Sequence, residues 1–297
     1  APRRGGGRGG DGVNDRAVYV ARLKSDPIFF FEQCVLIRVL VFPHEAHLGK
    51  PGSWVLVPFR VTEAQKLVIE WVLDCLRDGR PIRGIIDKCR QLGFSTVIEL
   101  LGLWLCAFHQ GIRAQVVGHL LKSTQRISQI LVIANDNLPK PLRHRLQARH
   151  VGSSFYWDHP GGTSIFDVVT QGSTEASRGD TPSFLHISEL GRWDLMRSTT
   201  SAEDVMQATL SAIPDVVGTW VFIESTAGGA SGSFYERFKS ALAEEHDGGL
   251  WKPWFFSWKG VTKYTLPQSP VDEAAHEAMK VAARAGDKVT AKRFALD

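Results

Sequence analysis

The sequence is poor in several features that define whole classes of protein. Its 297 residues include only four cysteines, and no two of them form a C-x-x-C pair, which argues against a zinc site. No apolar run reaches the roughly 18 residues that a membrane-spanning helix requires, and no segment has the pattern of a secretory signal peptide. Scattered, unpaired cysteines are typical of a reducing cytosol. We therefore expect a protein of the cell interior, neither secreted nor held in a membrane.

Most of the chain also lacks an excess of either charge. The formal net charge is +4, and residues 1–24 account for it with six basic and two acidic side chains. The remaining residues hold 29 basic and 29 acidic side chains. Any contact between the folded body and nucleic acid must therefore come from a local basic patch and not from bulk charge. With 43% apolar and 22% charged residues, the composition is that of an ordinary globular protein of one large or two modest domains.

The N-terminal segment has a composition of its own. Residues 1–12 are rich in glycine and arginine, which favours disorder. We expect residues 1–24 to form a flexible basic arm. Such an arm either contacts nucleic acid or is simply a solvated tail.

Beyond the arm, apolar segments with strand and helix periodicity alternate, which predicts an α/β fold: a mainly parallel sheet with helices on both faces. Short β segments are expected on either side of a turn at residues 158–162. Helix starts are indicated at Ser201, which forms a capping box with Asp204, and at Pro270. The other expected helices are Phe29–Leu40, Glu63–Leu76, Ser95–Phe108 and a segment through Ile127 and Ala134. The other expected strands are Ile82–Ile86, Ala114–Gly118, Ser183–Ile187 and Thr219–Glu224.

A phosphate-binding loop is indicated between the strand at residue 82 and the helix at residue 95. Residues 88–96 read K-C-R-Q-L-G-F-S-T, whereas the usual pattern is G-x-x-x-x-G-K-[ST]. Phe94 stands where the lysine is expected, and Lys88 stands where the first glycine is expected. A cation is still available, and backbone N–H groups at a helix N-terminus favour an anion. The alternative is a plain strand–turn–helix with surface charges.

Two later apolar strands also end in polar residues. The first, Phe184-Leu185-His186-Ile187-Ser188-Glu189, has the form of a Walker B element in which Ser188 replaces the usual aspartate and Glu189 keeps the role of general base. The second strand ends in Glu224-Ser225-Thr226 followed by a glycine pair. The alternatives are a core strand with an exposed glutamate and an ordinary Ser/Gly loop.

The displaced lysine, the Ser188-Glu189 step and the Ser225-Thr226 step, in this order along the chain, resemble the ATPase domain of the viral (bacteriophage) terminase large subunit. The resemblance runs from about Val55 to about residue 258. It implies a P-loop NTPase domain of the ASCE, RecA-like type over residues 25–260, with ATP and Mg²⁺ as cofactors, that drives DNA into a procapsid. The alternatives are a helicase-like DNA translocase and a nucleotide-dependent DNA-binding module without turnover.

The resemblance also assigns roles to individual residues. Lys88 would reach the β- and γ-phosphates, and Arg90 would stabilise the transferring phosphoryl group within the same subunit. Gln65 would read adenine, since an amide both donates and accepts, and Arg178 would act on a neighbouring subunit's site; the alternative for each is an ordinary surface side chain. The remaining assignments are nucleotide contacts by Cys89, Gln91, Leu92, Gly93, Phe94, Ser95 and Thr96, Mg²⁺ binding by Ser95 and Ser188, and coupling of hydrolysis to movement by Ser225 and Thr226.

Residues 122–150 contain the strongest local basic patch, with six Lys or Arg side chains against Asp136. Within it we expect Arg143, Arg145 and Arg149 to contact DNA phosphates; a solvated helix face is the alternative. The family resemblance implies double-stranded DNA, the portal protein and the small terminase subunit as partners, a homo-oligomeric ring on the portal, no membrane, and the host cytoplasm as location. It also implies that residues 261–297 form a helical linker towards a nuclease domain that is absent from this chain.

Overall fold

The computed structural model describes residues 11–171, 181–195, 202–226 and 228–257. Contacts divide the chain into two units, Ala1–Phe256 and Ser257–Asp297. Nearly all of the described residues belong to the first unit. The helix start expected at Pro270 lies outside the described residues, as does Ser201, although a helix does begin at Ala202.

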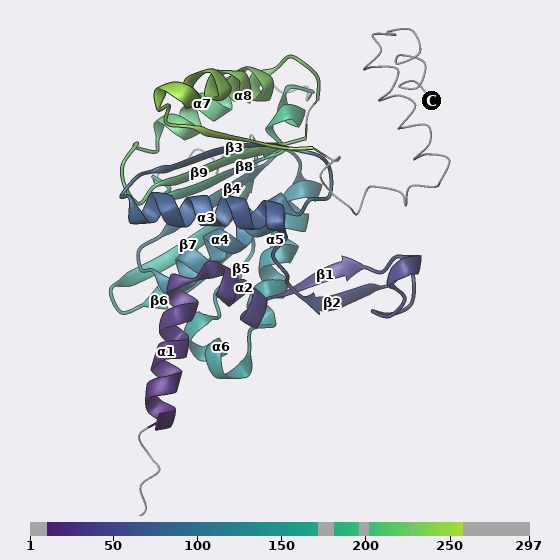
Figure 1. Cartoon of the computed structure of the whole chain (residues 1–297), viewed down its shortest axis with the longest axis vertical. Helices are drawn as coiled ribbons and strands as arrows, with labels where there is room; N and C mark the ends of the chain where they lie inside the picture. The colour runs from purple at the N-terminus through teal and green to yellow at the C-terminus, as the bar shows by residue number, and fades with distance from the viewer. Residues whose placement is uncertain (1–10, 172–180, 196–201, 227, 258–297) are drawn as a thin grey trace, which may run out of the picture. The chain divides into compact units, whose positions relative to one another are not determined.

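A sheet of eight strands runs through the described part of the first unit in the order β10-β3-β9-β8-β4-β7-β6-β5 (Figure 1). The six strands from β10 to β7 pair in parallel, and β6 and β5 extend the sheet in antiparallel fashion. The predicted parallel sheet is therefore confirmed, with an antiparallel edge. The strands are β3 (Ile82–Lys88), β4 (Arg113–Gly118), β5 (Arg149–Val151), β6 (Ser154–His159), β7 (Gly162–Thr170), β8 (Phe184–Ser188), β9 (Trp220–Ser225) and β10 (Lys252–Phe256).

Helices cover both faces of this sheet, as the alternating pattern predicts (Figure 1). The first face is covered by α3 (Glu63–Arg77), α4 (Phe94–Phe108) and α5 (Leu121–Asp136), and the opposite face by α7 (Ala202–Ser211) and α8 (Ser233–Glu244). Successive strand residues point to opposite faces, so Ile86 joins the core under α3 and α4 while Ile85 joins the core under α7 and α8. The short helix α6 (Lys140–Leu146) follows α5.

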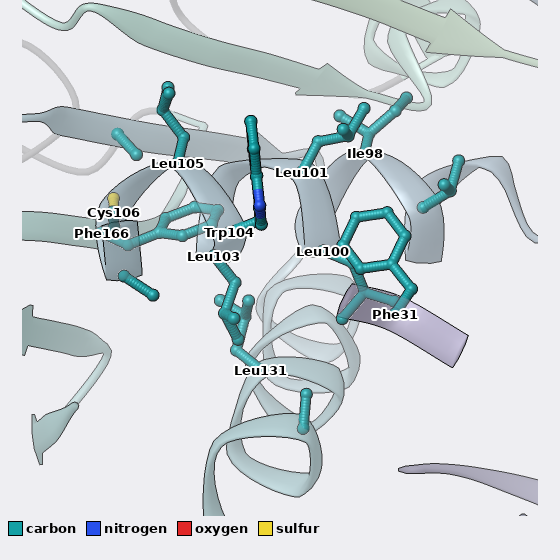
Figure 2. Packing of buried hydrophobic residues seen from close by; sticks show 14 of the residues in the cluster. Phe31, Ile98, Leu100, Leu101, Leu103, Trp104, Leu105, Cys106, Leu131 and Phe166 are labelled. Carbon is teal, nitrogen blue, oxygen red and sulfur yellow. The ribbon is translucent and has the colours of Figure 1, made fainter. Parts of the chain in front are cut away.

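Helix α4 forms the centre of the larger core. Twelve of its fifteen residues are buried, as expected of a helix that is apolar on nearly every side. Figure 2 shows Leu103 pointing toward Leu131 of α5, and both belong to the same cluster as Phe166 of β7. Glu99 is the only charged residue of α4 and is fully buried. The helix that follows the loop at residues 89–93 is thereby fixed in position by packing.

Two expectations for the N-terminal part are wrong. The segment Phe29–Leu40 is not one helix, because α2 (Pro27–Cys34) ends and β1 (Leu36–Leu40) follows, paired with β2 (Trp54–Pro58) in a separate two-stranded sheet. The β-branched residues of this stretch favour a strand. The flexible arm expected over residues 1–24 is a helix, α1 (Asp11–Ser25), from residue 11 onward, and Leu23 is buried in the core. No helix among the described residues is long and apolar enough to cross a lipid bilayer.

Gly102 marks the closest approach of α4 to the sheet. A Cβ atom at this position would lie 2.7 Å from Phe166 and 3.0 Å from Phe184. Alanine in place of glycine gains up to about 1 kcal/mol of helix propensity, but overpacking a core costs about 1–3 kcal/mol. We expect Gly102→Ala to lower the free energy of unfolding by about 1 kcal/mol, measured by urea denaturation, because the two effects oppose each other.

The Gly102→Ala/Phe166→Leu double variant is the control for this prediction. Phe166→Leu makes room for the new methyl group, so the two losses should be less than additive. Strictly additive losses would show that the methyl group does not meet Phe166.

Candidate functional site

The carboxyl ends of three neighbouring parallel strands carry the polar residues that the sequence indicates. Strand β3 ends at Lys88, β8 ends at Ser188 and β9 ends at Ser225, and the strand order places β9 between β3 and β8. Ligands of open α/β sheets bind at this edge. The tertiary structure therefore brings together the three motifs, which lie up to 137 residues apart in the sequence (88 to 225).

Two residues of the loop after β3 have a left-handed backbone conformation. Gln91 has φ 62° and Gly93 has φ 71°, the conformation at which α4 begins. The backbone N–H of Cys89 donates to the carbonyl of Phe256 on β10 at 3.0 Å. Turns of this kind present backbone N–H groups to anions at a helix N-terminus.

Gln65 holds this loop from α3. Its side-chain nitrogen donates to the carbonyls of Leu92 at 3.0 Å and Gly93 at 3.1 Å, and its side-chain oxygen accepts from the backbone N–H of Thr62. The side chain is buried. Every polar group of this amide is therefore bonded within the protein, and reading adenine, as expected from the sequence, would require these bonds to be exchanged.

Lys88 lies between two carboxylates. Its Nζ is 2.9 Å from Oε2 of Glu224 and 3.3 Å from Oε1 of Glu189, and its side chain is 6% exposed. Burial lowers the pKa of Lys88, but the two carboxylates more than offset this and raise the pKa above its usual value. The lysine is thus a charged group at the start of the loop between β3 and α4.

Glu189 has a backbone conformation that is rare for glutamate, with φ 56°. Such strain concentrates at functional positions. Besides Lys88, its carboxylate accepts a hydrogen bond from the Thr226 hydroxyl at 3.2 Å and lies 3.4 Å from the guanidinium of Arg192. The Ser225 hydroxyl accepts from the backbone N–H of Gly191 at 3.0 Å. Ser225 and Thr226 therefore contact the segment that carries Glu189.

A series of buried polar side chains continues from the loop into the core. We call this series the polar ladder; its members are Ser95, Ser188, Glu224, His186 and Glu99. Oε1 of Glu224 accepts from the hydroxyls of Ser95 at 2.7 Å and Ser188 at 2.9 Å, and Nε2 of His186 lies 3.5 Å from it. On its other side, Nδ1 of His186 lies 2.5 Å from Oε1 of Glu99. The side chains of His186, Glu99 and Glu224 are completely buried.

The charges of this ladder support one another. Burial lowers the pKa of His186, but the carboxylates of Glu99 and Glu224 raise it to about 9. Burial alone would raise the pKa of Glu224, whereas Lys88 and His186 bring it well below its usual value. Burial raises the pKa of Glu99. At neutral pH, Glu224 is therefore an ionised carboxylate inside the protein, between two cations.

Comparisons with known proteins identify the fold. No protein-family model and no curated protein sequence matches the chain. Among solved structures, the chain is similar to the large terminase of bacteriophage HK97, with a TM-score of 0.56 and 14% sequence identity over 79% of this chain and 43% of that one. This chain shares its fold with part of a bacteriophage large terminase. The resemblance predicted from the three motifs is thus confirmed at the level of the fold.

Two further terminase structures are similar at lower scores. The large terminase of a thermophilic bacteriophage gives a TM-score of 0.47 with 15% identity, over 74% of this chain and 50% of that one. The large terminase ATPase domain of Thermus phage P74-26 gives a TM-score of 0.43 with 15% identity, over 82% of this chain and 92% of that one. Because both scores lie below 0.5, the assignment of the terminase fold rests on the HK97 protein. This chain spans less than half the length of that terminase.

Of the other residues assigned from the terminase resemblance, Phe94, Arg90 and Thr96 lie at the loop, and the basic residues expected to contact DNA lie elsewhere. Phe94, at the lysine position, is buried and stacks on Phe256 at 4.5 Å between ring centroids. Arg90 is exposed on the loop, and Thr96 is half-buried in the first turn of α4. Arg178 lies outside the described residues. The exposed side chains of Arg143, Arg145 and Arg149 lie on α6 and on β5, the strand at the opposite edge of the sheet from β10.

Four residues of the site had no assigned role in the sequence interpretation: Glu99, His186, Arg192 and Glu224. The first three stand in or beside apolar segments, where a charged or polar side chain is a signal in itself. Glu224 was visible as the acid at the end of β9, directly before the Ser225-Thr226 step. What the sequence cannot reveal is that Glu99 and Glu224 meet His186 from two sides.

His186 separates two buried carboxylates, so its removal exposes each to the other. We expect His186→Ala to lower the free energy of unfolding by about 3–5 kcal/mol, the cost of breaking a buried ion pair by removing one partner. Denaturant unfolding of purified protein measures this. The matched control is His144→Ala, whose side chain is exposed on α6 and should change stability by less than about 0.5 kcal/mol. Equal effects of both substitutions would contradict the charged ladder.

Proposed function

We propose that this chain is the ATP-hydrolysing part of a viral DNA-packaging motor, a terminase large subunit that translocates double-stranded DNA into a procapsid. One observation carries the proposal. A buried lysine at the end of β3 and a strained glutamate directly after β8, the Walker B strand, lie 3.3 Å apart at the ligand-binding edge of a terminase-like sheet. Few other tasks require a cation and a carboxylate at a helix N-terminus in this arrangement.

In this mechanism, Lys88 exchanges its carboxylate partners for the β- and γ-phosphate oxygens of ATP. That exchange frees Glu189 to accept a proton from the attacking water. The loop backbone from Arg90 to Gly93 cradles the phosphates, whereas the N–H of Cys89 is bonded to the carbonyl of Phe256. Arg90, on the same loop, is placed to stabilise charge on the transferring group, and Arg192 keeps Glu189 oriented from the other side.

The oxygen donors near the loop suit Mg²⁺, which prefers oxygen ligands and needs only one or two protein carboxylates beside phosphate and water. The hydroxyls of Ser95 and Ser188 both point at one buried carboxylate oxygen, and we propose that these two residues help to hold the ion. No group of three or more His, Cys, Asp or Glu side chains suited to a metal occurs in the described part of the chain. Bound with ATP, Mg²⁺ would neutralise charge on the phosphates.

The contacts of Ser225 and Thr226 support a coupling role. Thr226 donates to Glu189, and Ser225 accepts from Gly191. If Glu189 moves when ATP replaces the carboxylates around Lys88, these contacts carry the movement to β9. The HK97 terminase is longer than this chain, so the remaining parts of the proposal concern the whole assembly: a ring on the portal protein, a small terminase subunit, Arg178 acting in trans, and a nuclease domain elsewhere.

A nucleotide-dependent module without turnover is the second candidate. Phe94 in place of the loop lysine and Ser188 in place of the aspartate favour it, because each removes a charge that most P-loop ATPases use. A helicase-like translocase would use the same loop, and DNA-dependent strand separation would distinguish it from a packaging motor.

Lys88 and Glu189 should have separable effects. We expect Lys88→Ala to weaken ATP binding, because it removes the cation nearest the phosphates, while Glu189→Gln keeps binding and slows hydrolysis by roughly 100-fold or more, the scale of a lost general base. Titration with a fluorescent ATP analogue measures the first effect, and phosphate release measures the second.

The control for these variants is Glu236→Gln, an exposed residue of α8, which should behave as wild type. Normal hydrolysis by Glu189→Gln would refute its assignment as the base. Wild-type protein that binds ATP and never hydrolyses it, with or without DNA, would favour the module without turnover.

The arginines of α6 and β5 give a prediction about DNA. Replacing Arg143, Arg145 and Arg149 together by glutamine should weaken DNA binding and reduce the slope of log K against log salt by about 0.9 for each lost phosphate contact. Fluorescence anisotropy at several salt concentrations measures both.

A triple control, with Lys66, Arg77 and Arg80 of α3 and its C-terminal turn replaced by glutamine, removes the same number of exposed charges elsewhere. Equal slopes for the two triple variants would place the DNA path away from α6.

A further inference from the structure

The polar ladder places the carboxylate of Glu224 beside Ser188, where the Walker B pattern of this sequence lacks its aspartate. Ser188 occupies the position at which a Walker B aspartate orders Mg²⁺, and a hydroxyl alone is a poor substitute for that charge. Ser188 donates to Glu224 at 2.9 Å, and so does Ser95, in the first turn of α4, at 2.7 Å. Both hydroxyls that should serve the metal therefore converge on one carboxylate, which belongs to a different strand.

We propose that Glu224 of β9 takes the place of the missing Walker B aspartate and anchors the Mg²⁺ of bound Mg–ATP together with Ser95. This inference rests on the proposed function, since it assumes that the loop binds a nucleotide. It adds a metal-anchoring residue that neither the loop pattern nor the Walker B pattern contains.

Strand register explains how a residue of β9 can reach this position. Ser188 and Glu224 are directly paired in the parallel β8–β9 strand pair. Adjacent strands lie about 4.8 Å apart, and a glutamate side chain is one methylene longer than aspartate. The carboxylate of Glu224 therefore extends from β9 to the hydroxyl of Ser188. Its charge lies close to the place that an aspartate carboxylate at position 188 would occupy.

The surroundings of Glu224 hold it in that place. Ser95 and Glu99 are four residues apart on α4 and share one face of the helix, while His186 and Ser188 are two residues apart on β8 and share one face of the sheet. Glu224 fits between the two pairs, with Oε1 facing both hydroxyls. Oε2 faces Lys88, whose Nζ lies 2.9 Å away. When Lys88 turns to phosphate, that oxygen becomes available to a cation.

A simpler role for Glu224 would be to neutralise Lys88. That role explains the 2.9 Å ion pair, and any two donors could satisfy the other carboxylate oxygen. It does not explain why the donors are Ser95 and Ser188, the two hydroxyls that stand at the expected Mg²⁺ positions. The two roles also differ in consequence. A counter-ion affects nucleotide binding equally with and without metal, whereas a metal anchor affects only the part of the affinity that Mg²⁺ adds.

The test is a titration of fluorescent ATP analogue in Mg²⁺ and in EDTA, with electron paramagnetic resonance of Mn²⁺ as a direct readout of bound metal. Wild type should bind the analogue more tightly with metal. Glu224→Gln should reduce this metal-dependent gain about 10- to 100-fold, the usual effect of losing a metal-site partner, and should lose the immobilised Mn²⁺ signal. Its affinity in EDTA should stay close to that of wild type.

Moving the carboxylate back to β8 provides the rescue. The Glu224→Gln/Ser188→Asp double variant should regain the metal-dependent gain and the Mn²⁺ signal, while Glu236→Gln serves as the surface control. Circular dichroism establishes that each variant is folded. If Glu224→Gln does not fold, Glu224→Asp keeps the charge beside Lys88 but shortens the reach toward Ser95, and the same loss of gain is expected.

A full metal-dependent gain in Glu224→Gln, or in Glu224→Asp should the first not fold, overturns the assignment of Glu224 while leaving the nucleotide site intact. Wild-type protein that binds no nucleotide in either condition overturns the proposed function, and this inference with it.

Discussion

The site depends on the ion pairs that Lys88 forms with two carboxylates. A buried cation is tolerated only where opposite charges surround it, and here the two carboxylates come from Glu189 and Glu224, on different segments. Because Lys88 is also the last residue of β3, this contact joins the start of the loop to the ends of β8 and β9. Ion pairs, as well as strand pairing, therefore hold this edge of the sheet in place.

Acidic and basic side chains alternate behind Lys88 through the core. Glu189, Lys88, Glu224, His186 and Glu99 follow one another from the surface to the buried face of α4. Alternation lets each group stabilise its neighbours in a region of low dielectric constant, where a single unpaired charge would be costly. Four successive contacts thus join Glu189 at the surface to Glu99 on α4.

Local patterns in the sequence were enough to predict the sheet, the buried helix α4 and the strands that end in Lys88 and Ser188, because apolar runs and turn residues determine these features within a few positions. The N-terminal part was predicted wrongly, since the apolar run through Phe29 changes from helix to strand near Cys34, a switch set by pairing with β2. The position of Glu224 could not be predicted either. It depends on which strands are neighbours and in what register, and both are properties of the folded chain.

The packing of Phe94 shows why lysine would not fit at this position of the loop. Its ring is fully buried against Phe256, and the loop next to it is hydrogen-bonded to the same residue. A lysine restored at position 94 would place its ammonium in an aromatic core, while Lys88 still occupied the mouth of the loop. A single substitution therefore cannot return this chain to the ordinary loop pattern. Introducing lysine at position 94 would require further changes around Phe256 that give its ammonium group polar partners.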